Sequence, residues 1–442
     1  MTKAAALALK TWRRRVFVAT WISYASFYFC RKPFYITKPV LASELGFSTE
    51  TLGLIGSAFL IAYALGQFMT AWLGSRFGAR VVVLLGMVVS LCANFSFGLS
   101  SSVGAFLALM TVNGFAQATG WAGNVASMAP WFKRTERGTV MGVWATNFQA
   151  GGVLANGASS WILAGVEASK KGGEHFLLAN TAIAAALGAY GYGWAYFFGS
   201  LVLFVASIVF LFGQRNRPED VGLPPIDADT DATSNGPSEQ GEQWSRATWI
   251  NVLYLGTFYF FIKFIRYAIW SWTPFLLKKY YGLEASDAGY LSTIFDVFGI
   301  AGVIAAGFIS DRWFLGRRVR ISFYFVAAMF ASSILLYTLG QTSLVVFGLA
   351  IGLLGFFLYG PDALLTSAGA IEVGSVRSAA KAAGIISGMG AIGSVAQELV
   401  LGKMLSKDDV GLVFLTLVLS SVLSAACLGI LMLRNRLGHS DL

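Results

Sequence analysis

The sequence is poor in charged residues, which make up 12% of its 442 positions. A soluble domain carries about 25%, so the low charge excludes an ordinary soluble protein. Hydrophobic residues make up 56%, and apolar runs of about 20 residues, each long enough to cross a bilayer, recur along nearly the whole chain. The composition therefore predicts an all-α polytopic membrane protein.

Cysteine and histidine are also scarce. The three cysteines, Cys30, Cys92 and Cys427, all fall in apolar runs without zinc spacing, so neither a disulfide framework nor a metal site is expected. The two histidines, His175 and His439, lie outside the apolar runs. No Walker loop is present, so ATP cannot power transport on this chain. We therefore expect no catalytic residue, no cofactor and no enzyme activity.

The net charge of +10 does not indicate a nucleic-acid partner, because the cations gather in alternate loops between apolar runs. This is the positive-inside pattern, and it predicts an integral membrane protein with both termini in the cytoplasm. The first apolar run carries polar and charged residues, so it is expected to be a span and not a cleaved signal. The cation clusters are Arg13–Arg15, Arg76 with Arg80, Lys133–Arg137, Arg215 with Arg217, Arg312–Arg320, Arg377 with Lys381, and Arg434 with Arg436.

The apolar runs predict twelve transmembrane helices in two six-helix bundles. The polar, Asp/Thr/Ser/Gly-rich segment 214–248 between them cannot bury apolar area and is expected to be a cytoplasmic linker. The expected domains are thus 1–213, the linker 214–248, and 249–442. The expected spans are 15–40, 52–74, 79–99, 103–130, 138–164 and 191–213, followed by 249–277, 286–310, 320–340, 343–369, 380–402 and 411–433.

The two halves repeat the same spacings between marked residues. The matched spacings are Arg31–Pro39 with Arg266–Pro274, Gly46–Gly53 with Gly282–Gly289, Gly53–Arg76 with Gly289–Arg312, and Gly120–Arg137 with Gly360–Arg377. Two parallel repeats of this kind place a substrate site at their interface near the bilayer midplane.

Two arginines, Arg31 and Arg266, occupy equivalent places in the two repeats, inside stretches expected to lie in lipid. A cation at that depth costs at least about 2.5–3.5 kcal/mol, so it is rare without a function. A guanidinium stays charged in a dry site, and its fork forms paired bonds to phosphate oxygens. The arginine pair therefore predicts an anion site; the alternative is that each arginine reaches the interface or pairs with an internal acid.

The loop Gly307–Arg318, and its partner Ala71–Arg80 in the first half, resemble the loop signature of the major facilitator superfamily. In the second copy Asp311 and Arg312 are intact, and we expect them to form a charge pair involved in gating. In the first copy Ser75 stands where the acid usually lies. This resemblance implies the major facilitator fold and says little about the substrate.

A sharper resemblance extends over the whole chain, to the organophosphate:inorganic phosphate antiporters, which include glycerol-3-phosphate transporters, hexose-phosphate transporters and sugar-phosphate exchangers. The segments that carry it are Phe27–Phe34, Ala62–Tyr63, Gly120–Trp121, Trp131–Phe132, Glu136–Gly138, Pro218–Leu223, Arg266–Tyr267, Phe295–Gly299 and Tyr359–Thr366. The resemblance implies that Arg31 and Arg266 bind the phosphoryl group. It also implies that four tyrosines line the cavity: Tyr24, Tyr28, Tyr63 and Tyr359.

The chain departs from the glycerol-3-phosphate transporters at two positions. Phe148 stands where they carry a histidine, and Gln67 replaces a lysine. The substrate therefore need not be glycerol-3-phosphate. Trp121 either stacks on a sugar or packs in the core, and Tyr267 is expected to contact substrate beside Arg266.

Two further cations lie near the arginines. Lys32 follows Arg31, so on a helix it points about 100° away; it either faces a neighbouring helix or assists the anion. Lys263 precedes Arg266 by three residues and shares its face. It either selects more anionic substrates or neutralises an acid such as Asp296.

The buried acids need partners, because a lone carboxylate in an apolar environment is paired or protonated. We expect Asp296 to be a countercharge to Arg266 or Lys263, with helix packing as the alternative. Asp362 either lines the cavity or forms a structural pair. Glu398 is expected to pair with Lys403.

The leading prediction is a secondary transporter that exchanges a phosphorylated small metabolite for inorganic phosphate by alternating access. We expect a monomer in a bacterial cytoplasmic membrane, with no nucleic-acid partner. One alternative is a membrane sensor for a sugar phosphate that signals to a partner kinase. Another is a proton-coupled carrier of an organic anion, with Asp296 or Asp362 as the proton site.

Overall fold

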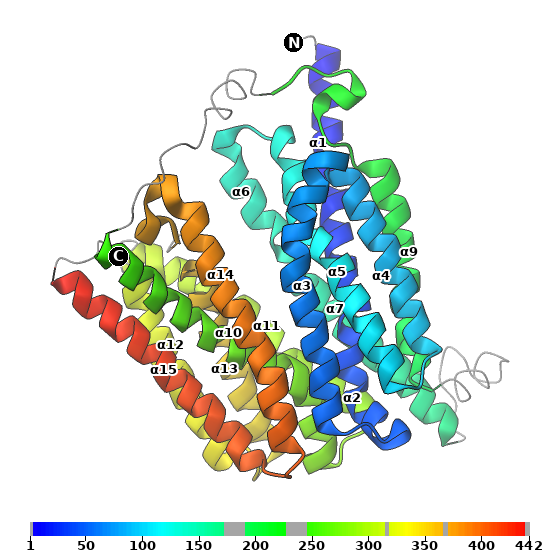
Figure 1. Ribbon diagram of the computed structural model, residues 1–442, viewed down its shortest axis with the longest axis vertical. Coiled ribbons are helices and arrows are strands. Elements are labelled where there is room, and N and C mark those ends of the chain that lie inside the picture. The colour runs from blue at the N-terminus through cyan, green and yellow to red at the C-terminus, as the bar shows by residue number, and fades with distance from the viewer. Residues whose placement is uncertain (1–2, 172–190, 227–244, 314–317, 366–369, 438–442) are drawn as a thin grey trace. The chain divides into compact units, whose positions relative to one another are not determined.

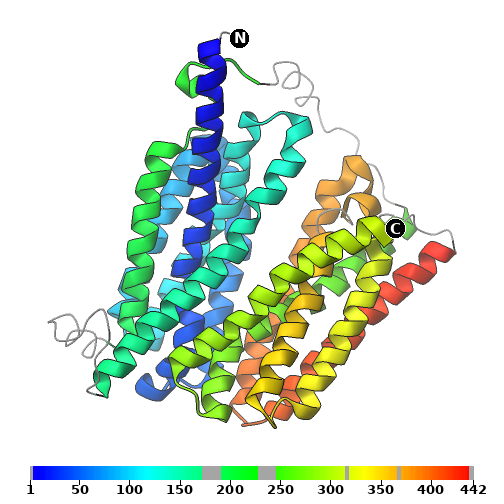
Figure 2. The ribbon, with the colours of Figure 1, turned by 180° about the vertical axis from the view of Figure 1, so that it is seen from behind.

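The computed structural model describes residues 3–171, 191–226, 245–313, 318–365 and 370–437. Every regular element in these ranges is a helix, which confirms the predicted all-α class. Figure 1 and Figure 2 show the helices from two opposite sides. The main helices are α1 (Lys3–Phe27), α2 (Lys32–Leu45), α3 (Thr49–Phe77), α4 (Ala79–Gly98), α5 (Val103–Met128), α6 (Arg134–Trp144), α7 (Thr146–Lys170), α9 (Gly193–Gly213), α10 (Arg246–Tyr281), α11 (Ala285–Trp313), α12 (Arg318–Leu339), α13 (Leu344–Leu364), α14 (Ala370–Leu405) and α15 (Val410–Arg436).

The helices form two compact units. One comprises residues 1–37 and 61–239, and the other comprises 38–60 and 240–442. The end of α2 and the start of α3 therefore pack with the second unit. The expected domain limits at 213 and 248 stay a prediction, since most of the expected linker lies outside the described residues.

Nine of the described helices are long and apolar enough to cross a membrane: α3, α4 and α9 to α15. The described part of the chain thus supports an integral membrane protein. Twelve spans were expected. α5 is not among the nine, and it contains several buried polar side chains, including Asn113, Gln117 and Asn124. The expected span 138–164 is divided between α6 and α7.

The expected first span, 15–40, is interrupted at its centre. A single 3-10 turn, Tyr28–Cys30, separates α1 from α2, and the backbone N–H of Arg31 donates to the carbonyl of Tyr28 at 3.1 Å. Pro33 follows two residues later, at the start of α2, where its missing N–H costs no helical hydrogen bond. The break places Arg31 at a helix junction.

In the first unit, α4 packs on α5 and α9, and α1 packs on α5, α7 and α9. Both ribbon views show α1 beside α9 (Figures 1 and 2). A Cβ built on Gly199 would lie 2.0 Å from the carbonyl oxygen of Phe29. Glycine is therefore needed for α9 to approach the 3-10 turn that precedes Arg31, which is close packing typical of membrane helices.

In the second unit, α10 packs mainly on α14, α11 on α13, and α12 on α13 and α15 (Figure 1). A Cβ on Gly355 would lie 2.2 Å from the carbonyl oxygen of Phe295. This contact sets α13 close to α11 at the residue that precedes Asp296.

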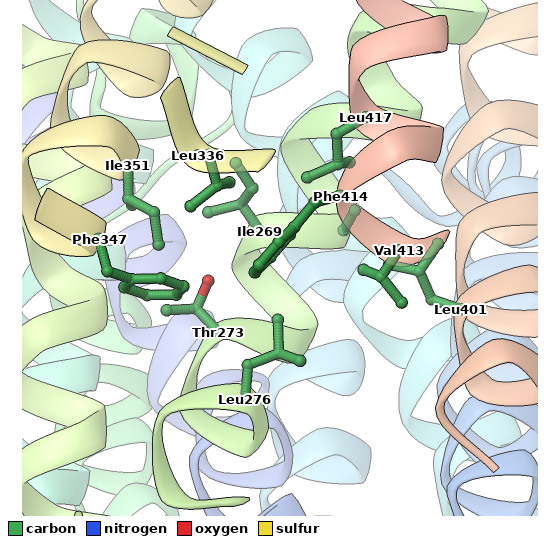
Figure 3. Close-up of a pocket in the computed structure, with 11 residues that line it drawn as sticks. Ile269, Thr273, Leu276, Leu336, Phe347, Ile351, Leu401, Val413, Phe414 and Leu417 are labelled. Carbon is green, nitrogen blue, oxygen red and sulfur yellow. The ribbon is translucent and has the colours of Figure 1, made fainter. Parts of the chain in front are cut away.

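A small cavity of about 10 Å³ lies within the second unit and is apolar (Figure 3). Residues from α10, α12, α13, α14 and α15 line it, among them Ile269, Phe347 and Phe414. Thr273 supplies the hydroxyl visible in the close-up. A cavity with this lining offers no cation and too little room for an anion, so the candidate site lies elsewhere.

Candidate anion-binding site

Arg31 is buried in the first unit, with 5% of its surface exposed. Its Nε donates to Oε1 of Gln117 at 2.8 Å, and its Cζ lies 4.8 Å from the ring centre of Tyr28 and 4.9 Å from that of Tyr63. Gln117 is itself oriented, because its Nε2 donates to the carbonyl of Cys30 at 3.1 Å. The guanidinium is thus held in a defined place, close to two aromatic rings.

A row of aromatic rings continues from Arg31. Tyr28 and Tyr24 lie 5.9 Å apart between ring centres, Tyr24 and Trp121 5.2 Å, and Trp121 and Trp144 5.2 Å. Trp144 is fully buried, whereas 37% of Trp121 is exposed. The structure therefore brings together Tyr24, Tyr28 and Trp121, and Trp121 is the partly exposed member of the row.

Tyr63 joins this row through its hydroxyl, which lies 3.4 Å from that of Tyr24. Lys32, at the start of α2, is completely buried. Its ammonium therefore does not reach solvent, and contact with the anion and contact with a neighbouring helix both stay predictions.

Arg266 occupies the middle of α10 in the second unit and is 7% exposed. Its Nη1 lies 2.7 Å from Oδ2 of Asp362, on α13. Its Cζ lies 4.5 Å from the ring centre of Tyr359 and 5.4 Å from that of Trp270. Like Arg31, it is buried among aromatic rings, but it also has a carboxylate partner.

Lys263 lies nearly one helical turn before Arg266, on the same face. Its Nζ is 3.9 Å from Oδ1 of Asp362 and lies over the rings of Tyr259 and Tyr267, at 4.9 Å and 5.9 Å. Asp362 thus contacts two cations, one through each oxygen. Of the two alternatives left open for Asp362, the structure supports a charge pair.

Asp296, on α11, is held by neutral donors. The Nε1 of Trp270 lies 2.8 Å from both carboxylate oxygens, and the hydroxyl of Tyr359 donates to Oδ1 at 2.5 Å. The ring of Tyr359 also lies against Arg266, so Asp296 belongs to the same cluster. Its expected role as a countercharge stays a prediction, because the direct ion pair of Arg266 is with Asp362.

The expectation for Glu398 is wrong. Glu398 pairs with Lys38 at 2.8 Å, with both side chains fully buried, whereas Lys403 is exposed. Ser271 joins the pair: it accepts from Lys38 Nζ and donates to Glu398, each at 2.5 Å. Sequence analysis missed this cluster, because Lys38 and Glu398 lie 360 positions apart and no local spacing links them.

Two residues of the loop motifs, Arg312 and Ser75, are exposed, unlike these buried groups. The side chain of Asp311 lies outside the described residues, so the expected Asp311–Arg312 pair stays a prediction.

In the described residues, no group of three or more histidine, cysteine, aspartate or glutamate side chains could hold a metal ion.

The family model of the Major Facilitator Superfamily matches residues 16–397. The chain belongs to this superfamily. It is therefore a membrane transporter and not an enzyme, and the fold expected from the loop motif is confirmed.

Three similar proteins support the resemblance to the organophosphate antiporters. The glycerol-3-phosphate transporter of Bacillus subtilis is 28% identical, over 96% of this chain and 93% of the relative. A probable hexose phosphate transport protein of Chlamydia trachomatis is 26% identical, over 89% and 85%. The membrane sensor protein UhpC of Escherichia coli is 27% identical, over 85% and 82%. These similarities confirm the resemblance to the organophosphate antiporters.

A solved structure has the same fold. The bacterial homologue of the human lysosomal transporter Spinster aligns with a TM-score of 0.71 at 16% identity, over 98% of this chain and 99% of that one. At this identity the likeness supports the fold alone.

Proposed function

We propose that this transporter exchanges a phosphorylated small metabolite, such as a sugar phosphate or glycerol-3-phosphate, for inorganic phosphate by alternating access. The observation that carries the proposal is the burial of Arg31 and Arg266 at equivalent repeat positions, each against aromatic rings. A buried charge is costly and is retained where it serves a function. Two relatives, a probable hexose phosphate transport protein and a glycerol-3-phosphate transporter, agree with an organophosphate substrate.

The proposed mechanism is electrostatic. A phosphate monoester carries about −1.5 to −2 charge at pH 7. Each guanidinium offers a planar fork to its oxygens, and the rings beside it keep the fork in place. Binding of the anion would compensate the buried guanidinium charge and so lower the cost of reorienting the loaded carrier. Exchange would then be favoured over one-way transport.

Counterflow in proteoliposomes tests this function. Vesicles are loaded with inorganic phosphate, and uptake of labelled phosphate, hexose phosphates and glycerol-3-phosphate is measured. We expect uptake to depend on internal phosphate. Uptake that instead follows an imposed proton gradient, with no need for internal phosphate, would support the proton-coupled carrier and reject the exchanger.

The sensor is the second candidate, and the similarity to UhpC favours it. A sensor would bind a sugar phosphate without substantial flux. Tight binding by purified protein, together with counterflow no faster than in protein-free vesicles, would decide for the sensor.

We further propose that both termini face the cytoplasm of a bacterial cell, because the cation clusters alternate between loops. The Arg13–Glu136 ion pair at 3.0 Å links two such clusters within the first unit. Access of a membrane-impermeant thiol reagent to a cysteine placed at position 3, in intact and in permeabilised cells, tests this orientation.

A further inference from the structure

Asp362 holds one nitrogen of the guanidinium that the proposed substrate would need. Its Oδ2 lies 2.7 Å from Nη1 of Arg266, and only 6% of the surface of Asp362 is exposed. A phosphoryl group gripped by paired bonds uses the edge of the guanidinium fork, where a carboxylate competes for the same donors. A carboxylate and a phosphate on one guanidinium would also repel each other.

The second oxygen of the same carboxylate already faces another cation. Oδ1 lies 3.9 Å from Nζ of Lys263, close enough for an ion pair but longer than a direct charge-assisted hydrogen bond of about 2.7–2.9 Å. Arg266 and Lys263 lie on one face of α10, while Asp362 comes from α13. A shift of the carboxylate towards Lys263 by about one ångström would shorten this contact to a direct charge-assisted hydrogen bond.

We propose that Asp362 is an internal counter-anion that competes with substrate for Arg266, and that Lys263 accepts it when the phosphoryl group binds. The inference rests on the proposed function. It assigns Asp362 and Lys263 as residues that set phosphate affinity and release. Lys263 then acts through Asp362, so it is a positioning residue and not a direct ligand.

Competition of this kind has two consequences. Asp362 keeps the charge of Arg266 compensated between substrates, which reduces the cost of a buried unpaired cation. It also helps substrate leave, because the carboxylate can return to Arg266. Removing the competitor should therefore tighten binding and slow turnover together, an effect that a merely structural residue would not produce.

Equilibrium binding of labelled inorganic phosphate to purified protein, paired with exchange in proteoliposomes, tests the inference. We expect Asp362→Asn to lower the Kd for phosphate by about tenfold, within the usual coupling range of residues in one charge network, and to reduce the exchange rate. Lys263→Met should raise the Kd by about the same factor, because Asp362 would then stay on Arg266.

The double variant Lys263→Met/Asp362→Asn decides between positioning and direct binding by Lys263. If Lys263 acts through Asp362, the double variant should bind phosphate as tightly as Asp362→Asn. The other outcome is that Lys263→Met raises the Kd for phosphate by the same factor in the Asp362→Asn background as in the wild type. Lys263 then contacts phosphate directly, and the inference is wrong. An unchanged or higher Kd in folded Asp362→Asn would also overturn it.

Two controls keep the result interpretable. Asp408→Asn removes the acid of the more exposed pair that Asp408 forms with Lys279 and should leave the phosphate Kd unchanged. If Asp362→Asn does not fold, as judged by its melting temperature, the Kd of the double variant is compared with that of Lys263→Met, and equal values overturn the inference. Wild-type protein that fails to bind phosphate would reject the proposed function as well.

Discussion

Lys38 and Glu398 form a fully buried ion pair, with Nζ and Oε2 2.8 Å apart. Lys38 also lies 3.7 Å from the ring centre of Trp272, and Ser271 bridges the two charges. Segment 38–60 is thereby joined to α10 and α14 inside the second unit. Glycines allow the approach: a Cβ on Gly53 would lie 2.4 Å from the carbonyl oxygen of Glu398.

Breaking this pair from one side should be costly. We expect Lys38→Met or Glu398→Gln alone to lower the free energy of unfolding by about 3–5 kcal/mol, because each leaves an uncompensated group in the interior. Lys38→Met/Glu398→Leu should recover much of that loss. Thermal unfolding in detergent measures both effects, and a double variant no more stable than the two single ones would contradict the prediction.

We expect that lysine cannot take over the function of Arg31 or Arg266 in phosphate exchange. Arg31→Lys and Arg266→Lys keep the charge but lose the planar fork. We expect each to reduce phosphate exchange in proteoliposomes by roughly ten- to a hundredfold, since a charged hydrogen-bonded group contributes roughly 1.5–3 kcal/mol. Expression and melting temperature serve as controls. Near-normal exchange by either correctly inserted variant would remove that arginine from the site.

Gln117 should act through Arg31. It holds the guanidinium at 2.8 Å, and Gln117→Leu removes this bond without removing the cation. We expect a rise of roughly tenfold in the KM for phosphate exchange, with a smaller change in the maximal rate. Gln67→Leu, at an exposed position of α3, is the matched control. Equal KM values for the two variants would exclude the positioning role.

Trp121 should discriminate between substrates. Trp121 is 37% exposed and its ring centre lies 5.2 Å from that of Tyr24, and an aromatic contact contributes about 0.5–1.5 kcal/mol. Trp121→Ala should therefore weaken hexose-phosphate uptake by roughly three- to tenfold and leave phosphate–phosphate exchange unaltered. Trp121→Phe should behave nearly as wild type. A loss shared equally by all substrates would show that Trp121 only packs.

Close packing at Gly355 should support the Asp296 side of the cluster. Gly355→Ala places a Cβ against the backbone of Phe295 and should cost about 1–3 kcal/mol of stability. Gly307→Ala, with nothing within 4 Å of the added Cβ, is the matched control and should be nearly neutral. Melting temperatures of the two variants in parallel test this, and equal values would contradict it.

Much of the architecture could be predicted without coordinates. Hydropathy alone predicts membrane helices, because a segment in lipid must satisfy its backbone internally and present apolar side chains. The spacing of Lys263 before Arg266 predicted a shared face, since helical periodicity is local. The equivalence of Arg31 and Arg266 came from a comparison of the two halves. Each of these features depends on short-range spacing or composition.

Partner choice among buried charges could not be predicted in this way. Glu398 lies five residues from Lys403, yet it pairs with Lys38, 360 positions away. Asp362 pairs with Arg266, and Asp296 is held by Trp270 and Tyr359. Residue type and spacing decided that these charges would be buried and would need partners. Which partners they have depends on how α2, α10, α11, α13 and α14 pack within the second unit, because the close approach of helices is a property of the tertiary fold.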